Sequence, residues 1–316
     1  MTTRIRPSAY LPCLVALFVL AWLGATTVPV RTAQSDLDAL MTRALARRDT
    51  GWKALPQLVL DERSEAEVVG PTGARILAER RDYAWFPRDG VFVRSPLRVN
   101  GRTVSEAERR TEEADFITRE RRRDERRRKN ESAREDAAGA PAGDDTAEAL
   151  AAAVRPYFLV NNSFLLDLKH EPGRYGLVGR ETLNGREVVK VEYYPTTLFQ
   201  SGRARPNRRA RERDERIPER LNKAVLVTLW IDPAISQIVR YELDDVDLGF
   251  LPGQWLVRIT EGRTTMTLSE VLPDVWLPTV AESMVRMQSP AGPVEWRWRL
   301  AYTNHKRADV GTRLVK

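Results

Sequence analysis

The sequence predicts a mainly β protein in which helices pack on an antiparallel sheet. Two observations carry this prediction: apolar and polar residues alternate along several C-terminal segments, and turn pairs such as Asp89-Gly90 and Asn184-Gly185 separate short β-type runs. Asp-Gly and Asn-Gly favour two-residue hairpins and therefore antiparallel pairing. The 316 residues, of which 42% are hydrophobic, are enough to bury a large core.

One short amphipathic helix is expected at the start of the folded chain, from Ser35 to about Arg48. Ser35 or Asp36 would cap it, and four of its apolar residues stand at helical spacing: Leu37, Leu40, Met41 and Leu45. From Leu58 the period changes to two, which predicts a meander of short strands. The β-type runs of this meander are 58–60, 68–69, 76–77 and 91–93, and Asn100-Gly101 ends it.

Two charged insertions are expected to interrupt the strands, at about 104–145 and 202–223. Residues 107–138 hold 11 basic and 10 acidic residues, so the first insertion is predicted to be an exposed helix with close ion pairs and too few apolar residues for a core. A polar linker and a helical or mixed segment that ends near Leu168 follow it. The second insertion contains Pro206 and Pro218 and is expected to be a loop.

The strand pattern is clearest from Tyr175 onward. A hairpin is predicted in which Asn184-Gly185 joins 175–182 to 188–194. The further strands that we expect are 225–231, 235–244, 254–260, 264–271, 279–287 and 294–302. In the last of these, Trp296 and Trp298 alternate with Arg297 and Arg299, which is typical of a sheet with one apolar face and one solvated face.

The first 33 residues have the features of an export signal, because two arginines precede an apolar run from Leu11 to about Ala25. The run is shorter than the roughly 20 residues that span a bilayer, so a cleaved signal is expected, with an uncleaved anchor in the inner membrane as the alternative. Residues 34–316 are then expected to form a single exported, periplasmic domain. Cys13 is the only cysteine and lies within the signal, so the mature chain has no disulfide.

Four motifs occur in an order that resembles a known class of proteins. They are Glu181-Thr182-Leu183-Asn184-Gly185-Arg186, Leu229-Trp230-Ile231-Asp232-Pro233, Ile238-Val239-Arg240-Tyr241 and Val275-Trp276-Leu277-Pro278. The series resembles the periplasmic LolA-like proteins of outer-membrane lipoprotein sorting and the lipid-binding half of RseB-type stress sensors. The resemblance implies a strongly curved antiparallel sheet, a half-open β-barrel closed by helices, with an apolar concavity that holds acyl chains. It carries over no individual ligand-contacting residue.

The apolar face of the predicted sheet supplies the candidate ligand cavity. Where a sheet curves more than its side chains can fill, the remaining concavity accepts an apolar ligand. The residues predicted to line it are Val239, Tyr241, Leu243, Trp255, Val257, Ile259, Met266, Leu268, Trp296 and Trp298. For each of these residues, an ordinary place in the core is the alternative.

The sequence contains no pattern for catalysis, for a metal or for a cofactor. The two histidines, His170 and His305, belong to no zinc-binding motif, and neither Ser163 nor Ser283 lies in a G-x-S-x-G elbow. We therefore predict a protein that is not an enzyme and needs no cofactor. An unrecognised hydrolase is the remote alternative.

These observations together favour a periplasmic carrier or sensor that shelters the acyl chains of a lipid or lipoprotein by apolar burial. The alternative is an envelope protein-interaction or stress-signalling module that uses the curved sheet as a scaffold. The Arg-rich insertions are expected to be solvated, or to contact anionic lipid headgroups or an envelope protein. Nucleic acid is not expected as a partner, because an exported protein rarely meets it.

Overall fold

The computed structural model of the protein describes residues 30–136, 168–196, 198, 223, 225–244 and 258–308. These residues contain two long helices, α2 (Val30–Ala54) and α3 (Glu106–Asp136), and a short 3-10 helix, η1 (Leu55–Gln57). Their strands are β1 (Leu58–Val69), β2 (Arg75–Arg88), β3 (Val91–Val99), β4 (Arg102–Thr103), β5 (Tyr175–Leu183), β6 (Arg186–Tyr193), β7 (Leu226–Asp232), β8 (Gln237–Asp244), β9 (Arg258–Leu272), β10 (Val275–Ser289) and β11 (Gly292–Arg307).

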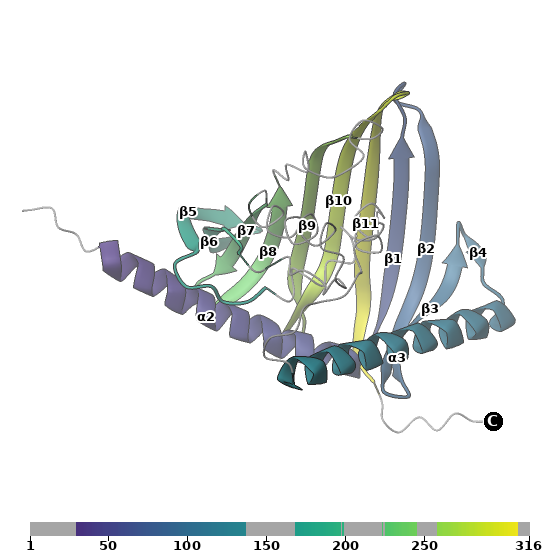
Figure 1. The fold of residues 1–316 in the computed structure, drawn as a ribbon, viewed down its shortest axis with the longest axis horizontal. Coiled ribbons are helices and arrows are strands. Elements are labelled where there is room, and N and C mark those ends of the chain that lie inside the picture. Colours follow the sequence, from purple (N-terminus) through teal and green to yellow (C-terminus); the bar gives the residue numbers. More distant parts are fainter. Residues whose placement is uncertain are drawn as a thin grey trace, which may run out of the picture.

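The described strands form one antiparallel sheet (Figure 1). Its strand order is β4-β3-β2-β1-β11-β10-β9-β8-β7-β6-β5. The pairing of β1 with β11, in which Leu58 lies opposite Arg307, brings the first and the last described strands together inside the sheet. Because β4 and β5 remain at its edges, the described sheet is not closed into a barrel. The mainly β, antiparallel fold class predicted from the sequence is confirmed.

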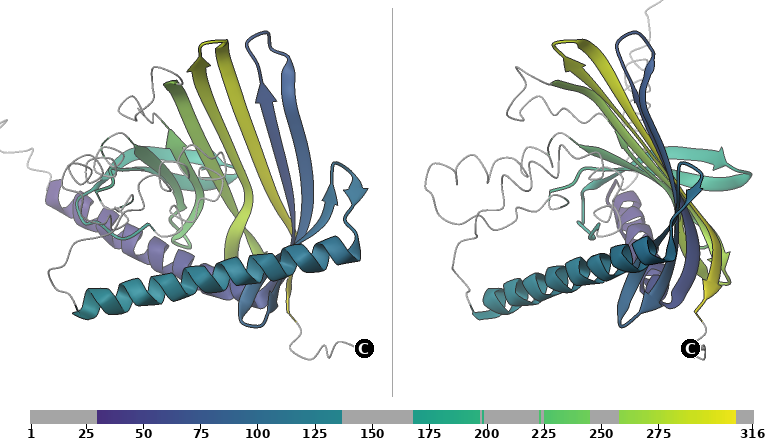
Figure 2. Two further views of the ribbon diagram at one scale, coloured as in Figure 1. Left: turned by 45° about the vertical axis from the view of Figure 1, so that its right-hand side comes forward. Right: turned by 90° about the vertical axis from the view of Figure 1, so that its right-hand side faces the viewer.

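The sheet is strongly twisted, and α2 packs along its lower end. Figure 2 shows that the β5–β6 hairpin runs almost across the direction of the long strands β1, β2 and β9 to β11. A right-handed twist between neighbouring strands accumulates over many strands and produces this change of direction. Helix α2 runs along the lower end of the sheet, as Figure 1 shows, and packs on β5, β8 and β10.

The tight turns adopt the backbone geometry that their residues predict. Asn184 and Gly185 have φ values of 51° and 77°, and Asp89 and Gly90 have 51° and 76°. Positive φ at both central residues is the mark of the two-residue turns whose twist matches that of a hairpin. The two predicted hairpin turns are therefore confirmed, and so is the turn at Asn100-Gly101, where φ is 50° and 83°.

The main core lies between α2 and the half of the sheet that runs from β5 to β9. Helix α2 contributes Leu37, Met41, Ala44 and Leu45 to it. The strands contribute a continuous set of buried residues across the sheet: Tyr175, Val188, Val189, Val191, Tyr193, Val227, Leu229, Trp230, Ile231, Ile238, Val239, Tyr241, Leu243, Met266, Leu268 and Trp276. Alternate residues of this set, such as Val191, Leu229 and Tyr241, share one face of the sheet, and burial of that face beneath α2 stabilises this half of the molecule.

The end of α2 approaches the sheet so closely that one position requires glycine. A Cβ atom built at Gly51 would lie 2.4 Å from the backbone oxygen of Trp276 on β10. Because the contacted atom belongs to the backbone, it cannot turn away as a flexible side chain would. Gly51 thus fixes the distance between α2 and β10.

We expect Gly51→Ala to lower the free energy of unfolding by about 1–3 kcal/mol, the usual cost of overpacking. Alanine is the better helix former by about 1 kcal/mol, so the expected sign depends on the close contact alone. Urea denaturation measures the change. An unchanged or raised stability would show that α2 does not approach β10 at this distance.

Helix α3 begins with a capping box and docks through its first turns. The Ser105 hydroxyl accepts a hydrogen bond from the Glu108 backbone amide, and the Glu108 carboxylate accepts one from the Ser105 amide at 3.0 Å. The buried Glu113 carboxylate accepts hydrogen bonds from the Ser95 hydroxyl at 2.5 Å and from the Arg88 guanidinium at 2.6 Å. The Phe116 ring meets Trp85 edge to face. These contacts anchor α3 to β2 and β3.

The structure corrects several boundaries predicted from the sequence. The helix expected from Ser35 already includes residues from Val30, so neither Ser35 nor Asp36 caps it. The runs 58–60 and 68–69, expected to be separate strands, merge into β1, because most charged residues between them occupy its solvated face; the run 76–77 is the start of the longer strand β2. Helix α3 is exposed along most of its length, as predicted, but it does contribute to the interior, since Glu113 and Ile117 are buried.

Some of the predicted segments lie outside the described residues. They are the export signal before residue 30, the linker and mixed segment at 137–167, the insertion at 202–222 and the start of the strand predicted at 254–260. Within the described part of the chain, no helix has both the length and the apolar character needed to cross a membrane.

Candidate functional site

The described residues of the predicted cavity wall share one face of the sheet. Residues directly opposite one another on paired strands point to the same side. Tyr241 lies opposite Met266, and Leu243 begins a row that continues through Thr264, Ser283, Trp298 and Ala66. The alternation read from the sequence therefore agrees with the ladder for Tyr241, Leu243, Met266 and Trp298.

These wall residues divide between two clusters that have different surroundings. Val239, Tyr241, Leu243, Met266 and Leu268 belong to the main core beneath α2. Trp296 and Trp298, whose ring centroids are 5.4 Å apart, belong to a second cluster on β1, β10 and β11. The first group occupies ordinary core positions, since a helix already packs against the main core.

We call the second cluster the strand patch. Its members are Ala66, Ala281, Trp296, Trp298, Leu300 and Tyr302. Neither α2 nor α3 contributes a residue to it within the described chain. The strand patch is therefore the part of the apolar face to which no described helix contributes a side chain.

The three remaining wall residues lie at or beyond the start of β9. Ile259 is half-buried and lies opposite Met287 of β10, beyond a register shift in the pairing. Trp255 and Val257 lie outside the described residues. That any of the ten residues lines a ligand cavity stays a prediction.

A buried ion pair lies at one end of the strand patch. The carboxylate of Glu62 on β1 pairs with the Arg94 guanidinium on β3 and accepts a hydrogen bond from the Trp85 indole nitrogen at 2.6 Å. The guanidinium carbon of Arg94 lies 3.6 Å from the centroid of the Tyr83 ring. Such a contact adds a cation–π interaction to the ion pair.

The electrostatic effects of this pair extend to the strand patch. Burial, the largest single effect, lowers the pKa of Arg94, but the charge of Glu62, its hydrogen bond with Arg94 and the nearby tyrosines together outweigh burial, and the net shift of the pKa is upward. Burial raises the pKa of the Tyr302 phenol, and the nearby Glu62 charge raises it further. Arg94 is thus held charged and Tyr302 neutral at the end of the apolar surface. No sequence pattern indicated this pair, because 32 positions separate its two members.

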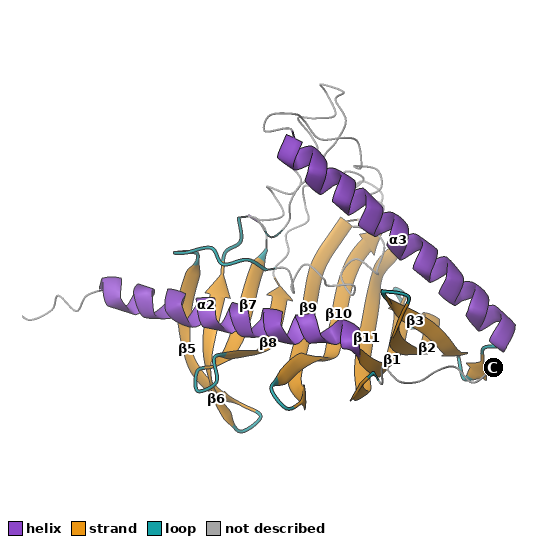
Figure 3. Ribbon diagram, turned by 90° about the horizontal axis from the view of Figure 1, so that it is seen from below, coloured by secondary structure: helices purple, strands orange, loops and turns teal. Residues whose placement is uncertain are grey.

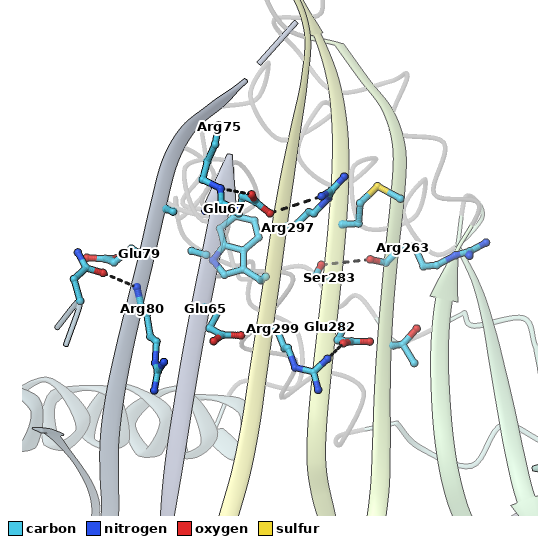
Figure 4. Close-up of a pocket in the computed structure, with 16 residues that line it drawn as sticks. Glu65, Glu67, Arg75, Glu79, Arg80, Arg263, Glu282, Ser283, Arg297 and Arg299 are labelled. Atoms are coloured by element: carbon cyan, nitrogen blue, oxygen red, sulfur yellow. Dashed lines mark hydrogen bonds and ion pairs between the residues drawn. The ribbon is translucent and has the colours of Figure 1, made fainter. Parts of the chain in front are cut away.

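A pocket of about 680 Å³ lies over β1, β2, β9, β10 and β11 (Figure 4). We call it the charged groove. It is lined by Glu65, Ala66, Glu67, Arg75, Ala78, Glu79, Arg80, Asn100, Arg263, Thr265, Glu282, Ser283, Met284, Arg297, Trp298 and Arg299. Trp298 is the one predicted wall residue in this lining. The groove is mainly charged, so it does not have the character of the predicted apolar concavity.

The charges of the groove largely pair with one another. Glu67 lies between Arg75, at 2.6 Å, and Arg297, at 3.7 Å, as Figure 4 shows. Glu282 pairs with Arg299 on the neighbouring strand. Exposed ion pairs of this kind contribute about 0–1 kcal/mol each, so the groove can exchange them for contacts with a charged partner at small cost.

The surroundings of the two histidines are described by the structure. His170 stacks on Tyr175, with ring centroids 5.7 Å apart, and its Nε2 atom lies 3.4 Å from the Thr42 hydroxyl. Burial lowers the pKa of His305. Among the described residues, histidine, cysteine and carboxylate side chains form no group of three that could hold a metal ion.

No family model and no curated protein matches the sequence. Among solved structures, a DUF1329 family protein from Desulfovibrio piger is 12% identical over 85% of this chain and 95% of its own, with a TM-score of 0.32. A putative outer membrane lipoprotein-sorting protein domain from Vibrio parahaemolyticus is 10% identical over 86% and 95%, with a TM-score of 0.30. The Pseudomonas aeruginosa MucA/MucB complex is 10% identical over 85% and 94%, with a TM-score of 0.18.

The lipoprotein-sorting class that the sequence resemblance predicts is therefore among the structural neighbours. TM-scores this low assign no role to any residue of this chain. Its function has to be inferred from its own two surfaces, the strand patch and the charged groove.

Proposed function

We propose that this protein is an exported, periplasmic carrier or sensor that shelters acyl chains of a lipid or lipoprotein against the strand patch. One observation carries the proposal: Trp296, Trp298 and Leu300 form an apolar cluster to which no described helix contributes. Each CH2 group of an acyl chain that leaves water contributes about 0.8 kcal/mol, so apolar contact alone suffices to hold such a chain. Binding of this kind needs neither catalysis nor a cofactor.

The buried pair of Glu62 and Arg94 supports the same proposal. This pair lies beside Tyr302, at the border of the strand patch. An apolar surface with a few fixed polar groups at its border is typical of a ligand site, where the polar groups set the orientation. Val239, Tyr241 and Leu243 would support the site from the core, without contact with the ligand.

Native mass spectrometry of protein purified from a membrane-containing host tests the proposal. We expect copurified lipid on the wild-type protein. The double variant Trp296→Gln/Trp298→Gln should retain at least about tenfold less lipid, because it removes two apolar contacts and places two amides in an apolar site.

The matched control is Arg297→Gln/Arg299→Gln, which changes the alternate residues of the same strand to the same side chain. This control should retain lipid as the wild type does, and circular dichroism should show both variants folded. Equal retention in both folded variants would remove the strand patch from the site. A wild-type protein without lipid would reject the carrier proposal itself.

The charged groove favours a second candidate function, that of an envelope protein-interaction or stress-signalling module. Its paired charges from β1, β2, β10 and β11 can be exchanged for those of a protein partner, which gives specificity more than affinity. Capture of a single envelope protein by lipid-free wild type, lost on Arg297→Gln/Arg299→Gln, is the result expected of such a module.

The exported location is part of the proposal, with the uncleaved inner-membrane anchor as its alternative. Its support is the apolar run between Leu11 and Ala25, which lies before the described residues. Fractionation of cells followed by N-terminal sequencing distinguishes a cleaved periplasmic form from a membrane-held form that keeps residue 1.

A further inference from the structure

The first charged insertion forms a helix whose two halves have different surroundings. The first half of α3 is held by Glu113, Phe116 and Ile117 against β2 and β3. Figures 2 and 3 show the rest of α3 running away from the β3 end of the sheet. The described side chains between Arg121 and Lys129 are exposed, so this part of α3 can make a further contact.

The second half of α3 is strongly basic. Residues 119–129 hold eight basic and three acidic residues. By contrast, residues 106–118 hold two basic and five acidic residues, and Glu106 pairs with Arg109 at 2.5 Å and with Arg110 at 2.8 Å. The positive charge of α3 is therefore concentrated in the half that leaves the sheet.

Helical spacing gathers four of these cations on one face. Arg119, Arg122, Arg126 and Lys129 follow one another at intervals of three, four and three residues, which places them on one side of a helix. At 100° per residue this side lies opposite the one that bears the docking residues of α3. We call it the basic stripe. Arg119 and Arg122 are exposed, and neither forms an ion pair with a described residue.

We propose that the basic stripe binds the surface of an anionic lipid bilayer. The stripe is a row of cations about 15 Å long that contains no apolar residue. A protein interface generally requires an apolar or aromatic centre that excludes water, and the stripe has none. An anionic bilayer instead attracts basic residues by charge alone, at about fivefold in affinity for each residue near the surface. The choice of a bilayer over nucleic acid rests on the exported location proposed above.

Flotation of the full-length protein with two kinds of vesicle tests this proposal. We expect binding to vesicles of phosphatidylcholine that contain phosphatidylglycerol, weaker binding as salt is raised, and little binding to phosphatidylcholine alone. The variant Arg119→Glu/Arg122→Glu should bind the anionic vesicles at least about 25-fold more weakly, because it removes two attractions.

The matched control is Arg180→Glu/Arg258→Glu, which makes the same change in net charge at exposed positions on β5 and β9. It should keep most of the binding. The proposal fails if the stripe variant, folded by circular dichroism, binds as the wild type does. It fails as well if the wild type binds both vesicles equally, if it prefers duplex DNA added as a competitor, or if the control loses binding to the same extent.

The test is independent of the acyl-chain site. Lipid retained through purification, measured by native mass spectrometry, should be unchanged in Arg119→Glu/Arg122→Glu. A protein that carries no lipid but binds anionic vesicles through the stripe would refute the carrier proposal alone. A protein that retains lipid but does not bind anionic vesicles would refute the membrane-docking proposal alone.

Discussion

Glu62→Ala is expected to lower the free energy of unfolding by about 3–5 kcal/mol, because it leaves a largely buried guanidinium without its counter-charge. Glu62 is buried, and its two carboxylate oxygens accept from Arg94 and from the Trp85 indole. Removal of the carboxylate therefore leaves two hydrogen-bond donors, Arg94 and the Trp85 indole, without their acceptor. Arg94 keeps some contact with solvent, so the lower end of this range is the better expectation. Urea denaturation followed by tryptophan fluorescence measures the change.

Two controls distinguish the cost of leaving a buried charge unpaired from the cost of losing an exposed ion pair. Glu282→Ala breaks an ion pair with Arg299 in which both side chains are about half exposed, and it should cost about 1 kcal/mol or less. Glu62→Leu/Arg94→Met removes both charges and should recover most of the stability lost in Glu62→Ala. Equal costs for Glu62→Ala and Glu282→Ala would show that the first pair is not buried.

Leu229→Ala is expected to cost about 2–5 kcal/mol, because it opens a cavity in the main core. Leu229 is fully buried at the centre of a row that runs from Val191 through Tyr241 to Met266. Its neighbours belong to paired strands and cannot move inward independently, so the space would stay largely unfilled. Differential scanning calorimetry and urea denaturation both report this loss.

The matched control is Leu177→Ala, the same substitution on the edge strand β5. Leu177 is 60% exposed, so its change should lie within about 0.5 kcal/mol. A large loss at Leu177 together with a small one at Leu229 would contradict the position of the core between α2 and strands β5 to β9.

The two faces of the sheet carry the two candidate functional surfaces, the strand patch and the charged groove. Among the described residues, α2 packs on the main core and contributes nothing to the strand patch, which is the part of the apolar face that the proposed function assigns to an acyl chain. The alternate rows of the same strands carry the ion pairs of the charged groove. Substitutions of Trp296 and of Arg297 can therefore separate the two candidate functions, although these residues are neighbours in the chain.

Local features were predictable from the sequence because they depend on neighbouring residues. The hairpin at Asn184-Gly185 follows from backbone preferences at two positions. The alternation around Trp298 follows from the period of a strand, and the helical form of the first charged insertion follows from its composition. The predicted ends of the helices and strands were less accurate than the predicted turns. Charged residues within β1 conceal the continuity of that strand, and nothing before Ser35 indicates that α2 begins at Val30.

The sequence by itself determined the fold class, the turn positions and the alternation that places Tyr241, Met266 and Trp298 on one face, because these depend on local dihedral preference and on a period of two. Only the tertiary structure decided that β1 pairs with β11, that Gly51 touches β10, and that Glu62 meets Arg94. It also decided which apolar residues α2 covers and which remain in the strand patch. Contacts between distant segments depend on the collective packing of all strands, which no local pattern encodes.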